Sequence, residues 1–323
     1  MGMKVLLAQD IDISGKQLLL NAGYELVLAP QEDPEVMKTC IADCEGVISK
    51  TFFLTEEILR AGKKLKVVGK HGVGIDNVVD LDTATKLGLY VVNTPYANMI
   101  SVAEHTIAGL LAFSKKILFM DTQTRLGNFE ANAVGDFHDV AGKTIGLIGA
   151  GNIGRSVAKI AALGLDMNVI AYDPFVKQDA LPEYIHKKEA MEEVLEEADF
   201  VTLHLAATAD TMHMMDLSKF RRMKSSAVFL NFARGGLVVE ADLVQALQEN
   251  IIRGAVLDVF AEEPPARDNP LFRMENVLLS PHSAACTDEA LQRTSYDVAK
   301  GIVQVLSGNK PSWCPNYGKV QNL

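Results

Sequence analysis

The sequence predicts an α/β protein built from two doubly wound parallel-sheet domains. Short apolar runs alternate with helical patterns over residues 4–92, and a second alternating series begins near residue 143. Strands that are separated by single helices form parallel sheets covered on both faces. The chain has 323 residues, which is long enough for two domains of ordinary size.

Composition predicts a globular protein and argues against two classes of partner. The chain is 48% hydrophobic and 22% charged, and its formal net charge is −10. Binding to nucleic acid or to an anionic membrane surface requires clustered Lys and Arg, which an acidic chain of this kind does not favour. We therefore expect a small-molecule ligand, with no nucleic acid and no membrane as partner.

The start of the chain and its cysteines indicate a cytoplasmic protein. The first ten residues lack the long apolar core and the small-residue cleavage site of a signal peptide, so we expect a strand there. No apolar stretch approaches the roughly 20 residues that span a bilayer. The cysteines Cys40, Cys44, Cys286 and Cys314 lack the paired spacing of a metal site, which favours reduced thiols and no bound metal.

The first series of elements predicts a domain without a nucleotide-binding turn. Its expected strands lie at 5–7, 26–28, 46–48, 65–68 and 90–92, and its expected helices lie near 14–22, 34–41, 55–61 and 81–87. No glycine turn of the dinucleotide type follows the first strand. We therefore expect this domain to bind the substrate.

A long apolar-rich run follows and predicts one helix of about five turns over residues 101–120. The run is too apolar for a solvated linker, so we expect an interdomain helix. Its apolar excess also indicates a subunit interface, and a homodimer formed through this helix is our hypothesis. A polar connection of small residues comes next, at 128–139.

A glycine turn at the start of the second series predicts a dinucleotide-binding unit. An expected strand at 144–148 leads into the hexapeptide GAGNIG, a helical pattern follows, and a second strand at 168–172 ends on Asp173. The tight turn requires Gly149, the approach of a pyrophosphate requires Gly151, and the close packing of helix and strand requires Gly154. The helix N-terminus, near Asn152 and Ile153, offers unpaired N–H groups and roughly half a positive charge.

The acid at the end of the second strand predicts NAD rather than NADP. Asp173 lies 19 residues after Gly154, where a carboxylate accepts both hydroxyl groups of the adenosine ribose. A 2′-phosphate would meet an uncompensated negative charge, because no Arg follows Asp173 directly. A glycine turn alone also occurs in other α/β folds, but the flanking strands and the acid favour the dinucleotide interpretation.

The second series continues with four more strands and a last helix. The strands are expected at 200–203, 228–231, 255–257 and 277–279, the helix at 287–306, and an extended tail at 309–323 that lies on the first domain. Arg234, Glu263 and His282 each follow one of these strands. Carboxyl ends of parallel strands meet at one edge of a sheet, where ligands bind.

These three side chains together predict an acid–base site. A guanidinium can bind a carboxylate and the adjacent carbonyl oxygen in a fork geometry, while a His titrates near neutral pH and a carboxylate can orient it. Taken singly, Arg234 also fits a surface turn, Glu263 a loop anchor and His282 a structural role. The set favours catalysis.

Five ordered motifs resemble the D-isomer-specific 2-hydroxyacid dehydrogenase family, and short phosphoglycerate dehydrogenase-like members in particular. The motifs are NTPYANMISVAEHT, GAGNIG with Asp173, NFARGGLV, DVFAEEPP and SPHSA. The resemblance covers essentially the whole chain. It implies a Rossmann NAD domain at 101–286, inserted into a flavodoxin-like substrate domain formed by 1–100 and 287–323. We expect no feedback control through an appended domain, because none follows Leu323.

The resemblance implies an NAD-dependent oxidoreductase that interconverts a D-2-hydroxy acid and a 2-oxo acid in a cleft between the domains. Arg234 is implied to bind the substrate carboxylate and to polarise the 2-oxo oxygen. His282 is implied to give that oxygen its proton, while Glu263 favours the charged imidazole. Closure of the cleft would exclude water.

Binding roles are also carried over by the resemblance. The implied cofactor-binding residues are Gly149, Gly151, Asn152, Ile153, Gly154, Asp173, His204, Ala233 and Asp258, the last on the nicotinamide amide. The implied substrate-binding residues are Lys50, Val73, Gly74, Asn98 and Arg234. The N–H groups of Val73 and Gly74 would receive the carboxylate. For His71 and His105 we favour packing roles over catalysis.

The sequence leaves several candidates for the substrate. Lys50 falls where phosphoglycerate enzymes carry a substrate-contacting Arg, and it can hold a phosphate as a point charge; an exposed Lys at a strand end is the equal alternative. The pair 3-phosphoglycerate and phosphohydroxypyruvate is one candidate, and a glyoxylate or hydroxypyruvate reductase is the alternative. A non-enzymatic, NAD-sensing protein similar to the corepressors of this family is a further alternative, although no basic segment supports it.

Overall fold

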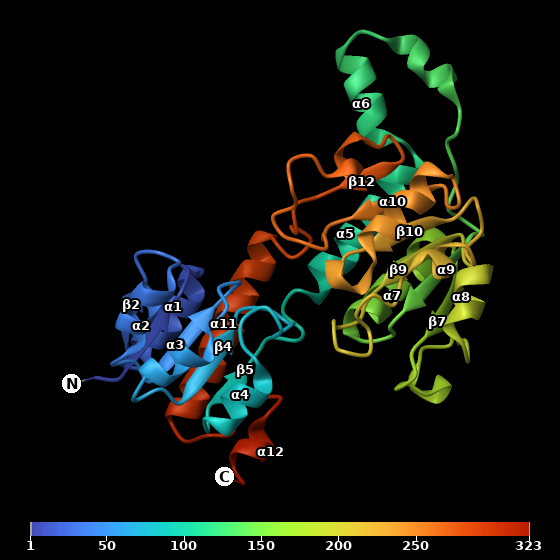
Figure 1. The fold of residues 1–323 in the computed structure, drawn as a ribbon. Helices are drawn as coiled ribbons and strands as arrows, with labels where there is room; N and C mark the ends of the chain where they lie inside the picture. Colours follow the sequence, from blue (N-terminus) through green and yellow to red (C-terminus); the bar gives the residue numbers. More distant parts are fainter. Residues whose placement is uncertain (1, 323) are drawn as a thin grey trace. The chain divides into compact units, whose positions relative to one another are not determined.

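The computed structural model describes residues 2–322 and divides into two compact units (Figure 1). The first, which we call the split unit, combines the chain up to Met99 with the chain from Ala285, and the second, the inserted unit, is Ile100–Ala284. Each unit contains one parallel sheet. The predicted α/β fold class with two parallel-sheet domains is confirmed. No helix among the described residues is both long and apolar enough to cross a membrane.

The split unit contains a five-stranded sheet in the order β2-β1-β3-β4-β5, which is the flavodoxin-like order. Its strands are β1 (Lys4–Leu7), β2 (Glu25–Leu28), β3 (Gly46–Ser49), β4 (Val67–Lys70) and β5 (Tyr90–Val92). Its helices are α1 (Ile13–Asn21), α2 (Pro34–Ile41), α3 (Glu56–Ala61), α4 (Leu81–Lys86), α11 (Asp288–Leu306) and α12 (Tyr317–Val320).

Two apolar layers cover this sheet, one on each face. One layer contains side chains of α2 and α3, and the other contains Leu19 of α1 with Val298 and Ile302 of α11. Helices α1 and α11 pack very closely, because a Cβ on Gly15 would lie 2.5 Å from the carbonyl oxygen of Ser295. The last long helix of the chain is therefore part of the core around the first strands.

The C-terminal tail lies on the edge of this sheet, but it is not wholly extended as we expected. Residues 317–320 form the short helix α12. Asn316 is fully buried and accepts a hydrogen bond from the Val91 N–H at 2.9 Å, while its amide donates to the Leu89 carbonyl oxygen at 2.9 Å. The Asn316 side chain thus makes hydrogen bonds with the backbone at the outer edge of the sheet.

The inserted unit contains a seven-stranded sheet in the order β12-β11-β10-β9-β6-β7-β8. Its strands are β6 (Thr144–Ile148), β7 (Asn168–Tyr172), β8 (Ile185–Lys187), β9 (Phe200–Leu203), β10 (Val228–Asn231), β11 (Gly254–Leu257) and β12 (Val277–Leu279). Its α-helices are α5 (Met99–Ser114), α6 (Ile117–Arg125), α7 (Asn152–Leu165), α8 (Met191–Glu197), α9 (Leu217–Phe220) and α10 (Glu240–Gln248). The strand order reverses between β6 and β9, and ligands bind at such a switch point in open α/β sheets.

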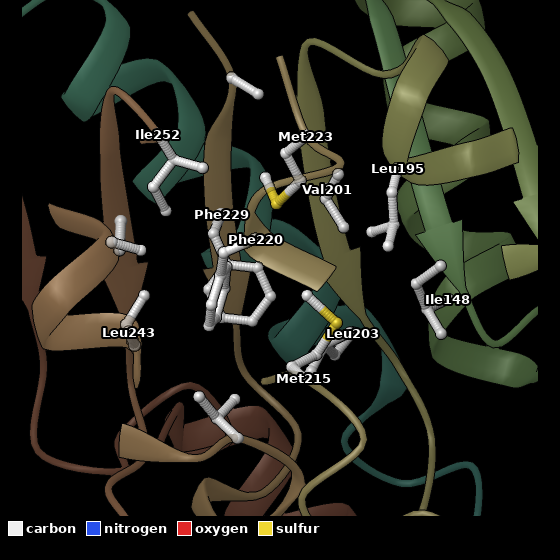
Figure 2. Close-up of a cluster of buried hydrophobic side chains, with 14 of the residues drawn as sticks. Ile148, Leu195, Val201, Leu203, Met215, Phe220, Met223, Phe229, Leu243 and Ile252 are labelled. Carbon is white, nitrogen blue, oxygen red and sulfur yellow. The ribbon is translucent and has the colours of Figure 1, made fainter. Parts of the chain in front are cut away.

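A large apolar cluster packs against one face of this sheet (Figure 2). Its centre contains Phe220 and Phe229, whose rings meet edge to face with centroids 5.3 Å apart. Leu203 and Ile148 come from the two strands that flank the reversal of strand order. The strand ends that carry the candidate site are thus anchored on a fully buried core.

The single helix expected over residues 101–120 is wrong. Helix α5 ends at Ser114, α6 begins at Ile117, and Lys116 between them has a left-handed φ of +49°. The apolar face of α5 is buried within the inserted unit, where a Cβ on Gly109 would lie 2.8 Å from the Val256 side chain. The apolar excess of this helix is therefore used inside the chain and does not by itself indicate a subunit interface.

Exposed apolar side chains gather instead in the next segment, residues 117–137, which we call the arm. Helix α6 buries none of its residues, and Figure 1 shows it standing away from the sheet of its unit. The exposed large side chains of the arm are Ile117, Leu118, Phe119, Leu126, Phe129, Val134 and Phe137.

Candidate active site

The glycine turn after β6 has a geometry that only glycine permits at two positions. Gly149 has a left-handed φ of +99°, and a Cβ there would lie 2.5 Å from the His204 carbonyl oxygen. A Cβ on Gly154 would lie 2.3 Å from the Gly149 carbonyl oxygen. At Gly151 a Cβ would meet nothing within 4 Å. The turn is thus tightly packed on its inner side and open at Gly151, which fits the close approach of a ligand.

Two further features of the turn fit a dinucleotide. Helix α7 begins after Gly151 without a side-chain cap, and the N-terminus of a helix is a place where anions bind. The carboxylate of Asp173 is fixed beside the turn, because it accepts hydrogen bonds from the N–H groups of Ala150 and Phe175, each at 2.9 Å. A positive helix end and a fixed carboxylate are the groups that a pyrophosphate and a ribose require.

His204 lies behind this turn and is not placed to act as an acid or a base. Burial lowers its pKa to about 3, so the imidazole is neutral at physiological pH. The ring Nε2 lies 3.0 Å from the hydroxyl of Thr202. Its backbone, which abuts Gly149, shapes the turn without contributing charge.

A paired imidazole and carboxylate lie after β11 and β12. The Nδ1 atom of His282 lies 2.7 Å from Oε2 of Glu263, and Oε1 of Glu263 accepts a hydrogen bond from the Phe260 N–H at 3.1 Å. The carboxylate is the acceptor, so the proton of this hydrogen bond belongs to Nδ1. Nε2 is then the ring nitrogen that can exchange a proton with a substrate.

Arg234 follows β10 and lies close to this pair. Its guanidinium donates to the Ala233 carbonyl oxygen at 2.9 Å. The loop approaches the neighbouring strand end because residue 235 is glycine: a Cβ there would lie 1.7 Å from the Phe260 carbonyl oxygen. The sequence thus brings the guanidinium loop against the backbone that leads to Glu263.

The pKa of Glu263 also indicates that His282 and Arg234 lie near this carboxylate. Burial alone would raise the pKa of this carboxyl, but the hydrogen bond from His282, with the charges of His282 and Arg234, lowers it below its ordinary value. The three side chains expected from the motifs therefore influence one another. A pocket of about 420 Å³ with mostly apolar walls, including Phe260 and Phe272, adjoins the pair.

Sequence reasoning missed Asn231, which shapes the Arg234 loop. This residue ends β10 and is buried, its amide donates to the Arg234 carbonyl oxygen at 2.9 Å, and its Oδ1 accepts from the Ala233 N–H at 3.1 Å. The signal was a polar residue at the end of an apolar strand, where it has to find buried partners.

Asp258 follows β11, but a contact with nicotinamide stays a prediction. The residue is 0% exposed, and its carboxylate accepts hydrogen bonds from the N–H groups of Ser283 and Ala284. A ligand could reach this carboxylate only if the neighbouring turn moved.

In the split unit, the loop that carries Val73 and Gly74 is hydrogen-bonded to the segment that follows β5. The Thr94 N–H donates to the Gly72 carbonyl oxygen at 2.9 Å, and the side-chain amide of Asn93 donates to the Val73 carbonyl oxygen at 2.8 Å. The buried Lys70, which sequence reasoning missed, donates from Nζ to Asn77 Oδ1 at 2.9 Å and also to the Lys50 carbonyl oxygen.

Two polar atoms beside this loop are buried without a hydrogen-bond partner among the described residues. They are the Thr94 hydroxyl and Oδ1 of Asn98. Buried polar atoms in folded proteins nearly always have partners. Unpaired atoms at this place fit a ligand or water that supplies the missing hydrogen bonds.

Lys50 lies after β3, and its charge acts on the same loop. Burial, followed by the positive charge of Lys50, lowers the pKa of His71 to about 4. The neutral ring of His71 lies 2.8 Å from the Ser295 hydroxyl through Nε2. A buried, neutral and hydrogen-bonded His71 fits the packing role that we favoured. Among the described residues, no group of three or more His, Cys, Asp or Glu could hold a metal ion.

Comparisons with known proteins match the fold and the family that the motifs resemble. Residues 107–284 match the family model "D-isomer specific 2-hydroxyacid dehydrogenase, NAD binding domain". A D-3-phosphoglycerate dehydrogenase from Archaeoglobus fulgidus is 36% identical over 95% of this chain and 58% of its own length. A glyoxylate reductase from Korarchaeum cryptofilum is 36% identical over 89% of this chain and 88% of its own length.

A solved glyoxylate reductase from Paecilomyes thermophila superimposes with a TM-score of 0.89 at 25% identity, and the match covers 97% of this chain and 98% of that one. The chain spans 49% to 58% of the length of the first phosphoglycerate dehydrogenases that it matches.

The pKa of Glu263 offers a direct test of the paired geometry. In His282→Ala the pKa of this carboxyl should rise above its wild-type value, because burial remains while the hydrogen bond and the imidazolium charge are lost. We expect the shift in a carboxyl ¹³C NMR titration. His186→Ala, which removes an exposed His of the same unit, should leave the titration unchanged. An unchanged Glu263 titration in His282→Ala would contradict the pairing.

Proposed function

Because this chain belongs to the D-isomer-specific 2-hydroxyacid dehydrogenase family, we propose that it interconverts a D-2-hydroxy acid and a 2-oxo acid with NAD as cofactor. The observation that carries the proposal is the 2.7 Å hydrogen bond between His282 and Glu263. This pair, with Arg234 beside it, lies at the edge of the sheet that also carries the glycine turn. A proton donor next to a dinucleotide site is what reduction of a carbonyl group requires.

The proposed mechanism assigns one task to each of the three side chains. Bound NADH supplies a hydride to the 2-oxo carbon. Arg234 binds the substrate carboxylate and stabilises the negative charge that develops on the 2-oxo oxygen. His282 gives that oxygen a proton from Nε2, and Glu263 keeps the ring in the tautomer with a proton on Nδ1 and stabilises the imidazolium. In the reverse direction His282 is the base.

We assign the cofactor to the turn after β6. The pyrophosphate would lie at Gly151 and the first N–H groups of α7, at Asn152 and Ile153, with the packing supplied by Gly149 and Gly154. Asp173 would accept the ribose hydroxyl groups, which favours NAD over NADP. His204, Ala233 and Asp258 are the further residues that we propose along the cofactor.

In the split unit we propose Val73 and Gly74 as the donors to the substrate carboxylate, with Asn98 and Lys50 as further contacts. The unpaired Oδ1 of Asn98 supports this assignment. Phosphohydroxypyruvate is the candidate that uses the charge of Lys50, and glyoxylate or hydroxypyruvate are the alternatives. A non-enzymatic, NAD-sensing role is the alternative from another class. We also propose a cytoplasmic location, which the free cysteines support.

The enzymatic proposal is tested by following NADH oxidation with a panel of 2-oxo acids: phosphohydroxypyruvate, hydroxypyruvate, glyoxylate and pyruvate. We expect turnover with at least one of them. His282→Ala should lower kcat by about 10²- to 10⁴-fold with little change in KM, since proton transfer contributes about that much. Arg234→Ala should raise KM and lower kcat, because the guanidinium contacts both ground state and transition state.

Arg222→Ala is the matched control for this test, because that exposed guanidinium of the same unit pairs with Glu196; it should be unaffected. Near-normal turnover in both site variants would refute the assigned roles. A wild-type protein that binds NADH but reduces none of the acids would favour the sensing alternative.

The cofactor assignment predicts a specific effect at Asp173. Asp173→Ala should lower kcat/KM for NADH by about 10- to 100-fold, the range expected for losing hydrogen bonds to a charged group, and should affect NADPH less. Steady-state kinetics with both cofactors measure this change. Asp179→Ala removes a nearby acid in the 3-10 helix that follows β7 and should change neither value. A wild-type kcat/KM that favours NADPH would overturn the preference for NAD.

We propose a homodimer formed through the arm. Exposed apolar surface beyond scattered single residues marks protein–protein contacts, and closed dimers are the commonest oligomers. In the arm Leu126 is 74% and Phe129 is 77% exposed. The double variant L126E/F129E should therefore be monomeric by light scattering where the wild type is a dimer. Leu163→Glu changes a leucine of α7 that is 66% exposed and should leave the dimer intact. A monomeric wild type would rule out this interface.

A further inference from the structure

The backbone of His282 adopts a conformation that needs support. Its φ is +52°, a left-handed value that residues with a Cβ rarely take. The side chain of this residue is also the one that must keep its Nδ1 on Glu263. Whatever stabilises the left-handed turn therefore decides where the imidazole points.

Asp258 makes four hydrogen bonds to the turn that carries His282. Its carbonyl oxygen accepts from the His282 N–H at 2.7 Å. Its Oδ1 accepts from the Ser280 hydroxyl at 2.6 Å and from the Ser283 N–H at 2.8 Å, and its Oδ2 accepts from the Ala284 N–H at 2.9 Å. The residues on both sides of His282 are thus bound to one side chain.

The chemistry of these contacts requires a carboxylate at position 258. Backbone donors face both carboxylate oxygens, and an amide has only one oxygen. In either orientation an Asn side chain would direct its NH₂ group at the N–H of Ser283 or of Ala284. Asp258 is fully buried and makes no ion pair among the described residues, so three uncharged donors stabilise its charge.

The network extends from Ser280 to α5. Nε2 of His105 lies 3.3 Å from the Ser280 hydroxyl, and its ring meets Phe232 edge to face at 5.5 Å. Phe232 is two residues before Arg234. The hydroxyl of Ser280 therefore connects the Asp258 carboxylate to a helix that also contacts the Arg234 loop.

We propose that Asp258 and Ser280 are positioning residues that hold His282 in its left-handed conformation and so keep the imidazole on Glu263. Neither needs to touch the substrate for this role. The inference rests on the proposed function only in that His282 is taken as the proton donor.

The test measures the His282 ring and the turnover separately. With ¹⁵N-labelled histidine and no cofactor present, the wild-type Nδ1–H should give a downfield, slowly exchanging NMR signal. Asp258→Asn and Ser280→Ala should broaden or lose this signal. Ser280→Thr, which keeps the hydroxyl, should retain it. Ser218→Ala is the matched control, because Ser218 also donates to an Asp carboxylate at 2.6 Å, in α9, and it should retain the signal.

In steady-state kinetics, Asp258→Asn should lower kcat about 10²-fold and Ser280→Ala about tenfold. This is the loss expected from a small misplacement of a catalytic group. KM for NADH should change less than about twofold in Ser280→Ala, because Ser280 acts through His282. If Asp258→Asn does not fold, Ser280→Ala carries the test.

The outcomes separate the inference from the proposed function. A wild-type signal together with wild-type kcat in Ser280→Ala overturns the inference. A loss that appears in Ser280→Ala only as a raised KM for NADH also overturns it, since a positioning role acts on kcat. If the wild type reduces no 2-oxo acid, the proposed function fails, and the NMR comparison alone decides whether these residues position the ring.

Discussion

The candidate site depends on loops of neighbouring parallel strands packing backbone against backbone. At Gly235 a side chain would overlap the Phe260 carbonyl oxygen, and at Gly149 it would overlap that of His204. Parallel strands bring their carboxyl ends to one edge, but side chains would normally keep the loops apart. Glycine at these two positions removes that spacing. The guanidinium, the acid–base pair and the dinucleotide turn can therefore share one edge of the sheet.

Much of this arrangement could be predicted from the sequence, because its signals are local. The strands are continuous apolar runs, and the glycine turn, Asp173 and the motifs around Glu263 and His282 are each read within a few residues. The break at Lys116 left no such signal, since no Gly or Pro marks it and the left-handed residue is a Lys. Tertiary context can override helix propensity, and a single sequence does not report it. The short helix at 317–320 in the tail was missed for the same reason.

The residues that support the site were harder to find than those that form it. Asp258 and Lys70 are buried polar groups with partners on other loops, whereas Asn231 bonds within its own loop. Contacts between segments, such as those of Asp258 and Lys70, are not reported by a single sequence. A polar residue directly after an apolar strand was the available sign, since such a group has to be satisfied in the interior.

Buried polar groups in the two units differ in a way that separates support from binding. Asp258 uses both of its oxygens on neighbouring N–H and O–H groups, so its contribution is complete within the folded chain. The Thr94 hydroxyl and Asn98 Oδ1 are equally enclosed but have no partner among the described residues. A saturated group stabilises a conformation, whereas an unsatisfied one destabilises the protein until something binds. The unsatisfied atoms lie beside the loop of Val73 and Gly74, and the saturated ones lie beneath His282. The first set is suited to recognising a ligand and the second to holding a reactive side chain still.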